Sequence, residues 1–377
     1  MKNLQHVMKH VRGFSLVELM VALTIGLIIL SAVSMLFVSS KKTYTTQDSL
    51  ARLQENARFA MQFIVKDLRL AGYYGCIDEI GEDTVNSTLN DETDFFYNAQ
   101  IPLEGVNGAS GQWYPSGETT LPTGVISGTD IVAIRKADSS SNLYLDQEMP
   151  NTSANLKTNG TDPNTGSAIT ISEILEEGDI VMISDCASAD VFQVTQLNDT
   201  DPHIVHNTGS GTPGNLTKEF SKPYSPSDDK TRIMKFATVQ YYIATGASGN
   251  PALFRQELDK TPVELVDGIE NLQILYGKDT TGDRVPNRYL KAGESGLQTT
   301  TDWNSVVSVR VGILARTLDD PTTGTSKETD VDSGVYDVDG DCALGTATSD
   351  ACYEFTPPAN DRHKRRVFQT VVHLRNL

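Results

Sequence analysis

Acidic side chains alternate along two loops of this 377-residue chain, an arrangement that suits a hard cation such as calcium. Oxygen ligands at positions 1, 3, 5 and 9 of an EF-like spacing come from Asp279, Thr281, Asp283 and Asn287. Position 12, where that loop needs a glutamate, is Leu290. The second loop alternates at Asp337, Asp339 and Asp341, but Gly340 comes too early for the same pattern. Both loops are calcium candidates, and the incomplete patterns favour solvated acidic turns.

Other patterns that could carry chemistry are incomplete. The stretch from Gly209 to Gly214 matches G-x-G-x-x-G, yet Pro213 interrupts the helix start that a dinucleotide site needs. His203 and His206 would need further ligands to hold a metal, and none is indicated nearby. The sequence contains no H-E-x-x-H, G-x-S-x-G or P-loop motif. We therefore predict a protein that is not an enzyme and that has no cofactor, with calcium as the one candidate.

The charge balance limits the classes of partner. The net charge is −18, which argues against nucleic acid or anionic lipid as the main partner of a soluble part. The basic run 362–366 lacks interleaved aromatic residues, which favours a solvated strand entry over a nucleic-acid site. Contact with DNA or with an acidic neighbouring protein is the alternative for this run.

A membrane-spanning segment is predicted near the start of the chain. The run from Phe14 to Val38 contains Glu18 as its only charged residue, and at about 1.5 Å per residue it can cross a hydrocarbon layer of about 30 Å. Three basic residues and no acid precede it, which keeps this end cytoplasmic. The alternative is a secretory signal cleaved near 31–34, but the apolar run continues past that point.

The apolar run passes directly into an amphipathic pattern. Apolar residues recur at spacings of three and four over 50–68, while charged residues lie off this stripe. Since no proline occurs before Pro102, one continuous helix from Phe14 to about Ala71 is predicted, with Gly72 placed to end it.

Two aromatic residues of this pattern, Phe59 and Phe63, lie one helical turn apart and opposite the apolar stripe. At such positions they would meet a neighbouring subunit. The alternative is that other parts of the same domain cover them.

Beyond Gly72 the composition changes to short strand-like runs separated by turn residues. The strand candidates are 130–135, 179–184, 191–196, 234–243, 272–276, 306–316 and 367–374. Long surface loops, which are candidate recognition surfaces, are predicted at 107–128, 151–168, 198–230 and 319–361. One helix followed by many strands predicts an α+β fold.

The hexapeptide GFSLVE at 13–18, after a short basic leader, resembles the class III signal of type IV pilins and type II secretion pseudopilins. The resemblance implies that a prepilin peptidase cuts between Gly13 and Phe14 and methylates the new amino terminus. It also implies four regions: a cleaved leader at 1–13, the transmembrane half of the helix at 14–38, its amphipathic half at 39–72, and an extracytoplasmic β-rich domain at 73–377.

This resemblance also implies a role for Glu18. A lone carboxylate in hydrocarbon is unfavourable unless it is neutralised or paired. By the example of the family, Glu18 of one subunit pairs with the Phe14 amine of its neighbour in the filament, which fixes the axial register. The alternative is a protonated Glu18 near the lipid interface.

Further blocks, which span nearly the whole chain in order, resemble the minor pilins of the PilW kind. They lie at 68–76, 184–195, 203–215, 266–289, 306–317 and in the terminal RRVFQTVVHLRNL. The J-type pseudopilin of type II secretion shares the leader, but its chain is usually much shorter. The resemblance implies a type IV pilin-like fold, in which the long helix packs on an antiparallel sheet domain with long loops.

The four cysteines, Cys76, Cys186, Cys342 and Cys352, are compatible with two disulfides in an oxidising compartment or with four buried thiols. In the pilin interpretation, a bridge between Cys76 and Cys186 would tie the helix end to the sheet. Cys342 and Cys352 would then close a short loop. Three connectivities remain open from the sequence alone.

The resemblance favours a minor pilin that takes part in type IV pilus assembly, primes the filament and lies at or near its tip. The expected partners are other minor pilins, the major pilin, the prepilin peptidase, the inner-membrane assembly platform and a tip adhesin. The expected location is the inner membrane, with one spanning helix and the bulk in the periplasm, and later the pilus at the cell surface. The alternatives are a J-type pseudopilin and a membrane-tethered adhesin or binding module outside any filament.

Overall fold

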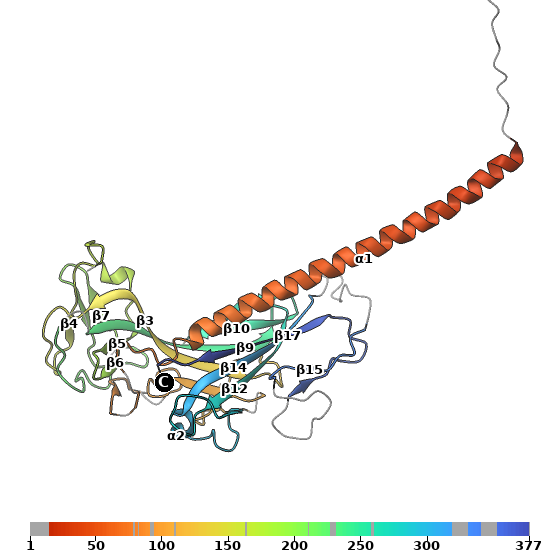
Figure 1. Cartoon of the computed structure of the whole chain (residues 1–377). Helices are drawn as coiled ribbons and strands as arrows, with labels where there is room; N and C mark the ends of the chain where they lie inside the picture. Colours follow the sequence, from red (N-terminus) through yellow and green to blue (C-terminus); the bar gives the residue numbers. More distant parts are fainter. Residues whose placement is uncertain are drawn as a thin grey trace, which may run out of the picture. The chain divides into compact units, whose positions relative to one another are not determined.

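The computed structural model describes residues 15–77, 80–81, 83–90, 94–108, 111–162, 164–209, 211–226, 231–257, 260–318, 331–340 and 353–376. The chain divides into two compact units, Met1–Ala51 and Arg52–Leu377. The predicted α+β fold is confirmed, because one long helix, α1 (Leu16–Leu68), is followed by a β-rich domain (Figure 1). The predicted continuous helix is also confirmed, and it ends three residues earlier than expected.

The part of α1 in the first unit exposes a continuous series of apolar side chains. They extend from Leu16 to Val38 and are each at least half exposed. This part of the helix is long and apolar enough to cross a membrane. Exposure of so many apolar side chains to water is unfavourable, so the segment requires lipid or protein around it.

The part of α1 in the second unit has one buried face. Its buried apolar residues, spaced by three and four, are Leu53, Ala57, Ala60, Ile64 and Leu68. They contribute to one core with residues from both larger sheets of the domain. After the helix, Gly72 takes a positive φ of 68°, and its N–H donates to the Arg135 carbonyl at 3.0 Å. Glycine allows this left-handed conformation at little cost, so the chain can turn away from the helix direction soon after α1 ends.

Among the described residues, eight strands form the larger sheet, and all of its pairs are antiparallel except β1 with β6. Its strands are β1 (Val85–Ser87), β2 (Leu103–Val106), β3 (Ile131–Tyr144), β5 (Ile180–Ser184), β6 (Ala189–Gln193), β9 (Arg232–Thr245), β10 (Pro251–Glu257) and β11 (Val263–Asp267). The long strand β9 is central: β3 pairs along one edge, while β5 and β10 share the other.

A second antiparallel sheet has the strand order β13–β12–β14–β17 within the described part of the chain. These strands are β12 (Ile269–Lys278), β13 (Arg288–Leu290), β14 (Val306–Arg316) and β17 (Arg365–His373). One face of β14 enters the shared core through Val309, Val311 and Ile313. On the other face, the backbone of Val338 lies so close to Gly312 that any Cβ there would collide with its carbonyl oxygen. A glycine in a strand interior commonly marks such a close approach.

Smaller elements complete the domain. They are β4 (Asn155–Lys157), β7 (Gln196–Asn198) and β8 (His203–Val205) in one sheet, β15 (Tyr336–Asp337) with β16 (Glu354–Phe355) in another, the 3₁₀ turn Ile171–Glu173, and the short helix α2 (Thr300–Trp303). All seven predicted strands are present, as β3, β5, β6, β9, β12, β14 and β17; β14 has the predicted bounds, and the other six have shifted ends.

The predicted long loops are only partly loops. The stretch 151–168 contains β4, 198–230 contains β8, and 319–361 contains β15 and β16. The described residues of the stretch 107–128 contain no named strand, but Trp113 is buried there, and its indole N–H donates to the Thr120 carbonyl at 3.0 Å. The stretch 107–128 therefore forms part of the fold, because a buried aromatic side chain holds it in place, and the other three stretches contribute short strands.

Candidate interaction surfaces

The start of α1 uses Glu18 as a helix cap. The backbone N–H of Ser15 donates to Glu18 Oε2 at 2.9 Å, and the N–H of Val17 donates to Ser15 Oγ at 3.3 Å. The first bond is one half of a capping box, in which an acid at the third helical position accepts the N–H of the N-cap residue, and the second is an N-cap bond to the second helical position. The pattern S-x-x-E at 15–18 could have revealed this role from the sequence. The predicted processing residues Gly13 and Phe14 lie outside the described residues.

The outward face of α1 in the second unit is aromatic and basic. Phe59 and Phe63 are 40% and 41% exposed, so their own domain covers them only in part. The Arg58 guanidinium lies 5.6 Å from the centre of the Phe59 ring. Exposed basic side chains on this stretch of helix are Arg52, Arg58 and Lys66, with Glu55 as an exposed acid among them. Large exposed aromatic residues beside arginine are typical of protein interfaces.

A buried ionic cluster holds the end of α1 on the larger sheet. Asp67 forms ion pairs with Lys136 at 2.5 Å and with Arg255 at 3.4 Å, and it accepts the Tyr241 hydroxyl at 2.7 Å. Burial alone would raise the pKa of Asp67, but the charge and hydrogen bonds of these partners outweigh it, and the pKa is lowered. The carboxylate is therefore ionised where the helix meets β3, β9 and β10. The sequence interpretation missed this residue, although an acid on the buried stripe of a helix was a usable signal.

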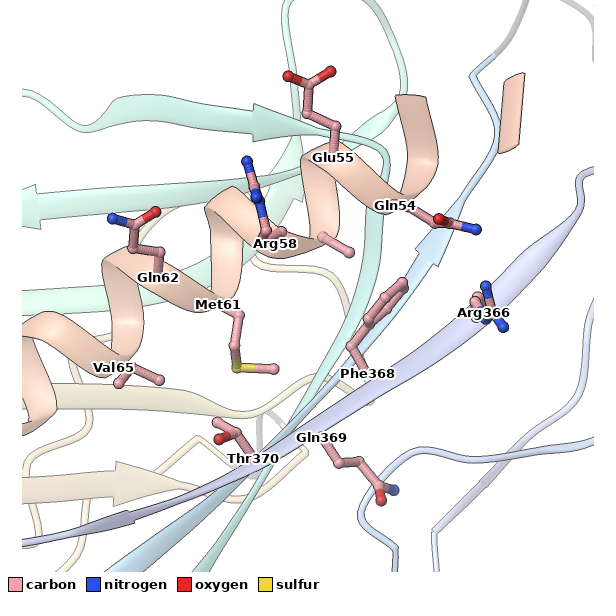
Figure 2. A pocket seen from close by; sticks show the side chains of 11 residues that line it. Gln54, Glu55, Arg58, Met61, Gln62, Val65, Arg366, Phe368, Gln369 and Thr370 are labelled. Atoms are coloured by element: carbon pink, nitrogen blue, oxygen red, sulfur yellow. The ribbon is translucent and has the colours of Figure 1, made fainter. Parts of the chain in front are cut away.

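A groove of about 890 Å³ runs between α1 and the strand β17 (Figure 2). Figure 2 shows Met61 projecting from the helix and Phe368 from the strand into the space between the two elements. Val65 adds to the apolar lining. The charged lining residues are Arg58, Arg366 and Glu55, so basic groups outnumber the acid in this acidic protein.

The backbone N–H and C=O groups of successive residues in β17 point to opposite sides of the strand. The N–H of Leu374 donates to the Val307 carbonyl at 3.0 Å, and the N–H of Thr317 donates to the Lys364 carbonyl at 2.9 Å. Given the register between β14 and β17, these bonds make the even-numbered residues 366–372 the hydrogen-bonded partners of β14. The N–H and C=O groups of the odd-numbered residues 367–373 therefore point away from β14.

The basic run before β17 is partly structural. The Arg365 side chain is fully buried and pairs with Glu270 at 2.5 Å, Asp361 at 2.6 Å and Asp332 at 3.0 Å. Desolvation opposes a buried charge, but the hydrogen bonds to Glu270 and Asp361 prevail and raise the pKa of Arg365. The interpretation of the whole run as a solvated strand entry is wrong for this residue, because three carboxylates supply the partners that a buried arginine requires.

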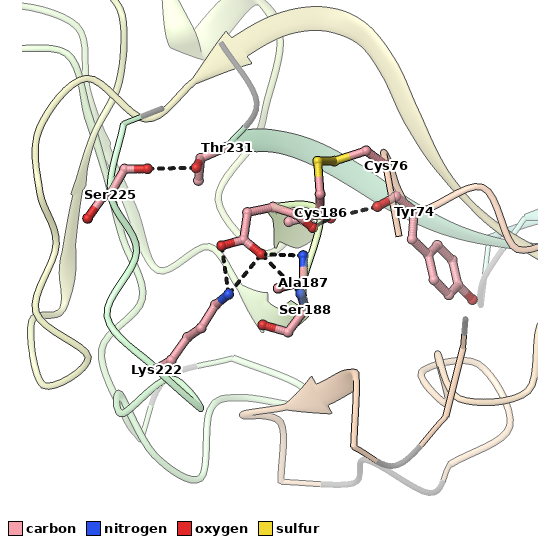
Figure 3. Close-up of a disulfide and its surroundings, with 10 residues drawn as sticks. Tyr74, Cys76, Cys186, Ala187, Ser188, Lys222, Ser225 and Thr231 are labelled. Atoms are coloured by element: carbon pink, nitrogen blue, oxygen red, sulfur yellow. Dashed lines mark hydrogen bonds and ion pairs between the residues drawn. A yellow bond between two sulfur atoms is a disulfide. The ribbon is translucent and has the colours of Figure 1, made fainter. Parts of the chain in front are cut away.

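The structure joins Cys76 and Cys186 in a disulfide with a Cα–Cα distance of 4.7 Å (Figure 3). The bond ties the segment after α1 to the turn between β5 and β6. The Ser184 hydroxyl adds a second link by donating to the Tyr74 carbonyl at 2.6 Å. In the same turn Asp185 pairs with Lys222 at 2.6 Å. Figure 3 shows this ion pair in the surroundings of the disulfide. Cys342 and Cys352 lie outside the described residues.

The first calcium candidate holds a turn of its own backbone. Asp279 accepts backbone N–H groups from Thr281 and Gly282 at 2.8 Å and from Arg284 at 2.7 Å. The hydrogen bond from Thr281 is the largest cause of the lowered pKa of Asp279. Asp283 accepts the N–H of Val285 at 3.0 Å. These are the bonds of an acidic turn.

In the second calcium candidate, the described carboxylates accept hydrogen bonds from different segments. Asp337 accepts the N–H of Gly340 at 2.6 Å, whereas Asp339 is buried and accepts the N–H of Tyr353 at 3.1 Å. Asp341 lies outside the described residues. Within the described part of the chain, no group of three or more His, Cys, Asp or Glu side chains is arranged to hold a metal ion.

The two histidines have different surroundings. His206 is fully buried and stacks on Phe220 with a ring distance of 4.4 Å, and its Nε2 lies 3.1 Å from the Lys218 carbonyl. Burial lowers the pKa of His206 to about 4, so the ring is neutral at pH 7. His203 begins β8 and lies 2.5 Å from the Asp201 carbonyl through Nδ1. The glycine-rich stretch after them is a loop, in which Gly209, Gly211 and Gly214 have positive φ.

Two models of known families match parts of this chain. The prokaryotic N-terminal methylation motif matches residues 8–34, which include the capped start of α1 and its apolar part. The start of the chain is therefore similar to that of prepilins, and this motif and the apolar helix indicate membrane anchoring and association with a pilus.

The family model for type IV pilus-assembly protein W, PilW, matches residues 240–376. With both matches, the chain is similar to the PilW-family minor pilins of type IV pili. The second range contains β10 to β17 and thus the strand that borders the groove. Comparison with curated proteins and with solved structures gives no match.

Proposed function

We propose that this protein is a minor pilin that primes assembly of a type IV pilus and lies at or near its tip. The observation that carries the proposal is the uncovered face of α1, where Phe59 and Phe63 are 40% and 41% exposed beside basic side chains. A helix that follows a methylation motif and keeps such a face open is suited to packing against other pilin helices. The partners are other minor pilins, the major pilin, the assembly platform in the inner membrane and a tip adhesin.

Processing prepares the amino end of the helix for this packing. In the proposal, prepilin peptidase removes residues 1–13 and the new terminus is the methylated amine of Phe14. This cation precedes the helix cap at Ser15, so it lies at the positive end of the helix dipole, where a positive charge is disfavoured. A carboxylate from another subunit relieves this repulsion. Glu18 of a neighbour supplies it, and the pairing sets the axial register of the two helices.

The proposal assigns a location to each part of the chain. Residues 14–38 span the inner membrane before assembly, and the domain that follows α1 lies in the periplasm. The basic leader remains on the cytoplasmic side, as charge asymmetry across a membrane favours. In this position the outward face of α1 can meet other pilins before they enter the filament. The work of the protein is then done by contacts rather than by catalysis.

Mass spectrometry of the amino terminus tests the processing step. The full chain is extracted from membranes of cells with and without prepilin peptidase, and its intact mass and terminal sequence are determined. A chain that begins at N-methylated Phe14 only in the presence of the peptidase supports the proposal. A chain that begins at Met1 or near Ser34 under both conditions overturns it and leaves a membrane-anchored or secreted binding protein.

Incorporation into sheared pili tests the contacts. We expect Glu18→Leu to be processed and retained in the membrane but absent from pili. Phe59→Glu combined with Phe63→Glu should lower the amount in pili at least tenfold. Val285→Glu is the matched control, since Val285 is 55% exposed and lies outside the helix. Normal incorporation of the Glu18 and phenylalanine variants would contradict the proposal and favour an anchored adhesin.

A further inference from the structure

The edge of the sheet at β17 offers unpaired backbone. Within the described residues, β17 pairs with β14 alone, and this pairing continues without a bulge from Arg365 to His373. The N–H and C=O groups of residues 367, 369, 371 and 373 point to the open side. This edge is therefore a regular template for one more strand.

The usual protections of an edge strand are missing from the middle of β17. The strand contains no proline and no bulge, and Val371 is 45% exposed on it. Charged residues stand only towards its ends, at Arg365, Arg366 and His373. A long, flat and partly apolar edge tends to pair with another chain, and folded proteins generally prevent this unless the pairing has a use.

The groove lies beside this edge, where the side chains of an added strand would be placed. The side chains of Arg366, Phe368 and Thr370 line the groove on the face of β17 that looks towards α1. A strand added to the edge would direct alternate side chains to the same face, because the side-chain period of a strand is two. Those side chains would enter the space of about 890 Å³ between Met61, Val65 and Phe368. Backbone pairing and side-chain packing are thus available at one place.

Charge selects the kind of strand. Arg58 and Arg366 line the groove with Glu55 as the single acid among its lining residues. An antiparallel pair of two β17 strands would set Lys364 and Arg366 of one copy against His373 and Arg375 of the other, so a second copy is disfavoured. A segment with apolar residues at alternate positions and carboxylates at its ends would pack against the apolar lining and pair with the arginines of the groove.

We propose that β17 accepts an extended, acidic segment of another subunit as an added strand, whose inward side chains fill the groove against α1. The mode is β-strand addition: main-chain bonds give affinity, and alternate side chains give specificity. That the donor is a filament subunit rests on the proposed function. The recognition itself depends only on the edge, the groove and their charge.

A synthetic probe tests the recognition directly. The nine-residue peptide DEVTVTVDE carries three inward valines and acidic ends, and KKVTVTVKK has the same centre with basic ends. Binding of each fluorescent peptide to the full chain in a neutral detergent is measured by anisotropy at low salt. We expect saturable binding of the acidic peptide, with an affinity at least tenfold higher than that of the basic peptide. Equal affinities, or no saturable binding, would overturn the proposal.

Substitutions at the edge separate strand addition from simple charge attraction. The N–H of Val371 points away from β14, so Val371→Pro removes one donor of the open edge and keeps the pairing with β14. Val371→Thr keeps this N–H and is the matched control. We expect at least tenfold weaker binding of DEVTVTVDE for the proline variant and a change below twofold for the threonine variant. An unaffected proline variant with the native fluorescence of its buried tryptophans contradicts strand addition.

Two further results decide the occupant and the link to function. Arg366→Glu should weaken the acidic peptide and strengthen the basic one; unchanged preferences would refute the charge argument. Concentration-dependent dimers of the full chain that disappear in Val371→Pro would identify a second copy as the occupant and overturn the acidic partner. If the chain is processed and enters pili but does not bind the peptide, the added strand alone is refuted. If it binds the peptide but does not enter pili, only the pilin function is refuted.

Discussion

Removal of the disulfide between Cys76 and Cys186 should cost a large part of the stability of the domain. The two cysteines are separated by 110 residues. In the chain-entropy description, closing such a loop lowers the entropy of the unfolded chain by about 16 cal/mol/K, which corresponds to about 5 kcal/mol at 25 °C. Typical domains are stable by about 5–15 kcal/mol, so the combined variant Cys76→Ala and Cys186→Ala should remain folded with a small margin.

Urea unfolding followed by tryptophan fluorescence measures this loss. Both tryptophans, Trp113 and Trp303, are buried in the second unit and report on its core. For a slope of about 3 kcal/mol/M, a loss of about 5 kcal/mol lowers the urea midpoint by about 1.7 M. The same comparison under reducing conditions is the control, since wild type and variant should then unfold at similar urea concentrations. A shift below about 0.5 M without reductant would refute the argument, because the bridge would then add little constraint to the unfolded chain.

Three further substitutions test the packing and the buried charges. Gly312→Ala should destabilise the domain by about 1–3 kcal/mol in urea, because its Cβ meets backbone, whereas Gly81→Ala, with open space around it, should change stability by less than about 0.5 kcal/mol. Asp67→Asn should cost about 3 kcal/mol at pH 7, since it leaves the largely covered Lys136 ammonium without its carboxylate. Because the pKa of Asp67 is lowered in the folded protein, its contribution to stability is present above about pH 4 and is lost at lower pH. The free energies of unfolding of wild type and variant should therefore converge at low pH. A difference that stays constant with pH would contradict the ionic role. His206→Phe should remove a loss of about 3 kcal/mol that wild type shows as the pH falls from 6.5 to 4, because the unfolded chain binds a proton in this range and the buried ring, with its pKa of about 4, does not. Identical pH profiles would show that the ring is protonated in the folded protein.

The elements that follow from local patterns were predictable from the sequence. The helix followed from the stripe that includes Ala57 and Ile64 and from the absence of an early proline, and its end followed from Gly72. The long central strands followed from their apolar runs. The short strands β4 and β8 were not predicted, because three residues carry too little periodicity. Their place depends on burial of Leu156 and Ile204 in a separate apolar cluster, which is a tertiary effect.

The buried charges could not be predicted in the same way. Arg365 lies in a run of basic residues, and only the fold brings Glu270, Asp332 and Asp361 to it. Their separation along the chain hides the network from any pattern with a short period. The open edge of β17 was equally hidden, because a strand pattern identifies neither the neighbours of a strand nor its free side.

The positions of these ionic clusters explain why the groove can serve as a rigid receptor. Asp67 fixes the end of α1 on the larger sheet, and Arg365 fixes the beginning of β17 through carboxylates from three segments. Each cluster is buried, so removal of one partner leaves an unpaired charge, and movement of either element away from its sheet is costly. The two walls of the groove are therefore held in place before any partner binds. A preformed site loses less conformational entropy on binding, which favours recognition of a short extended segment there.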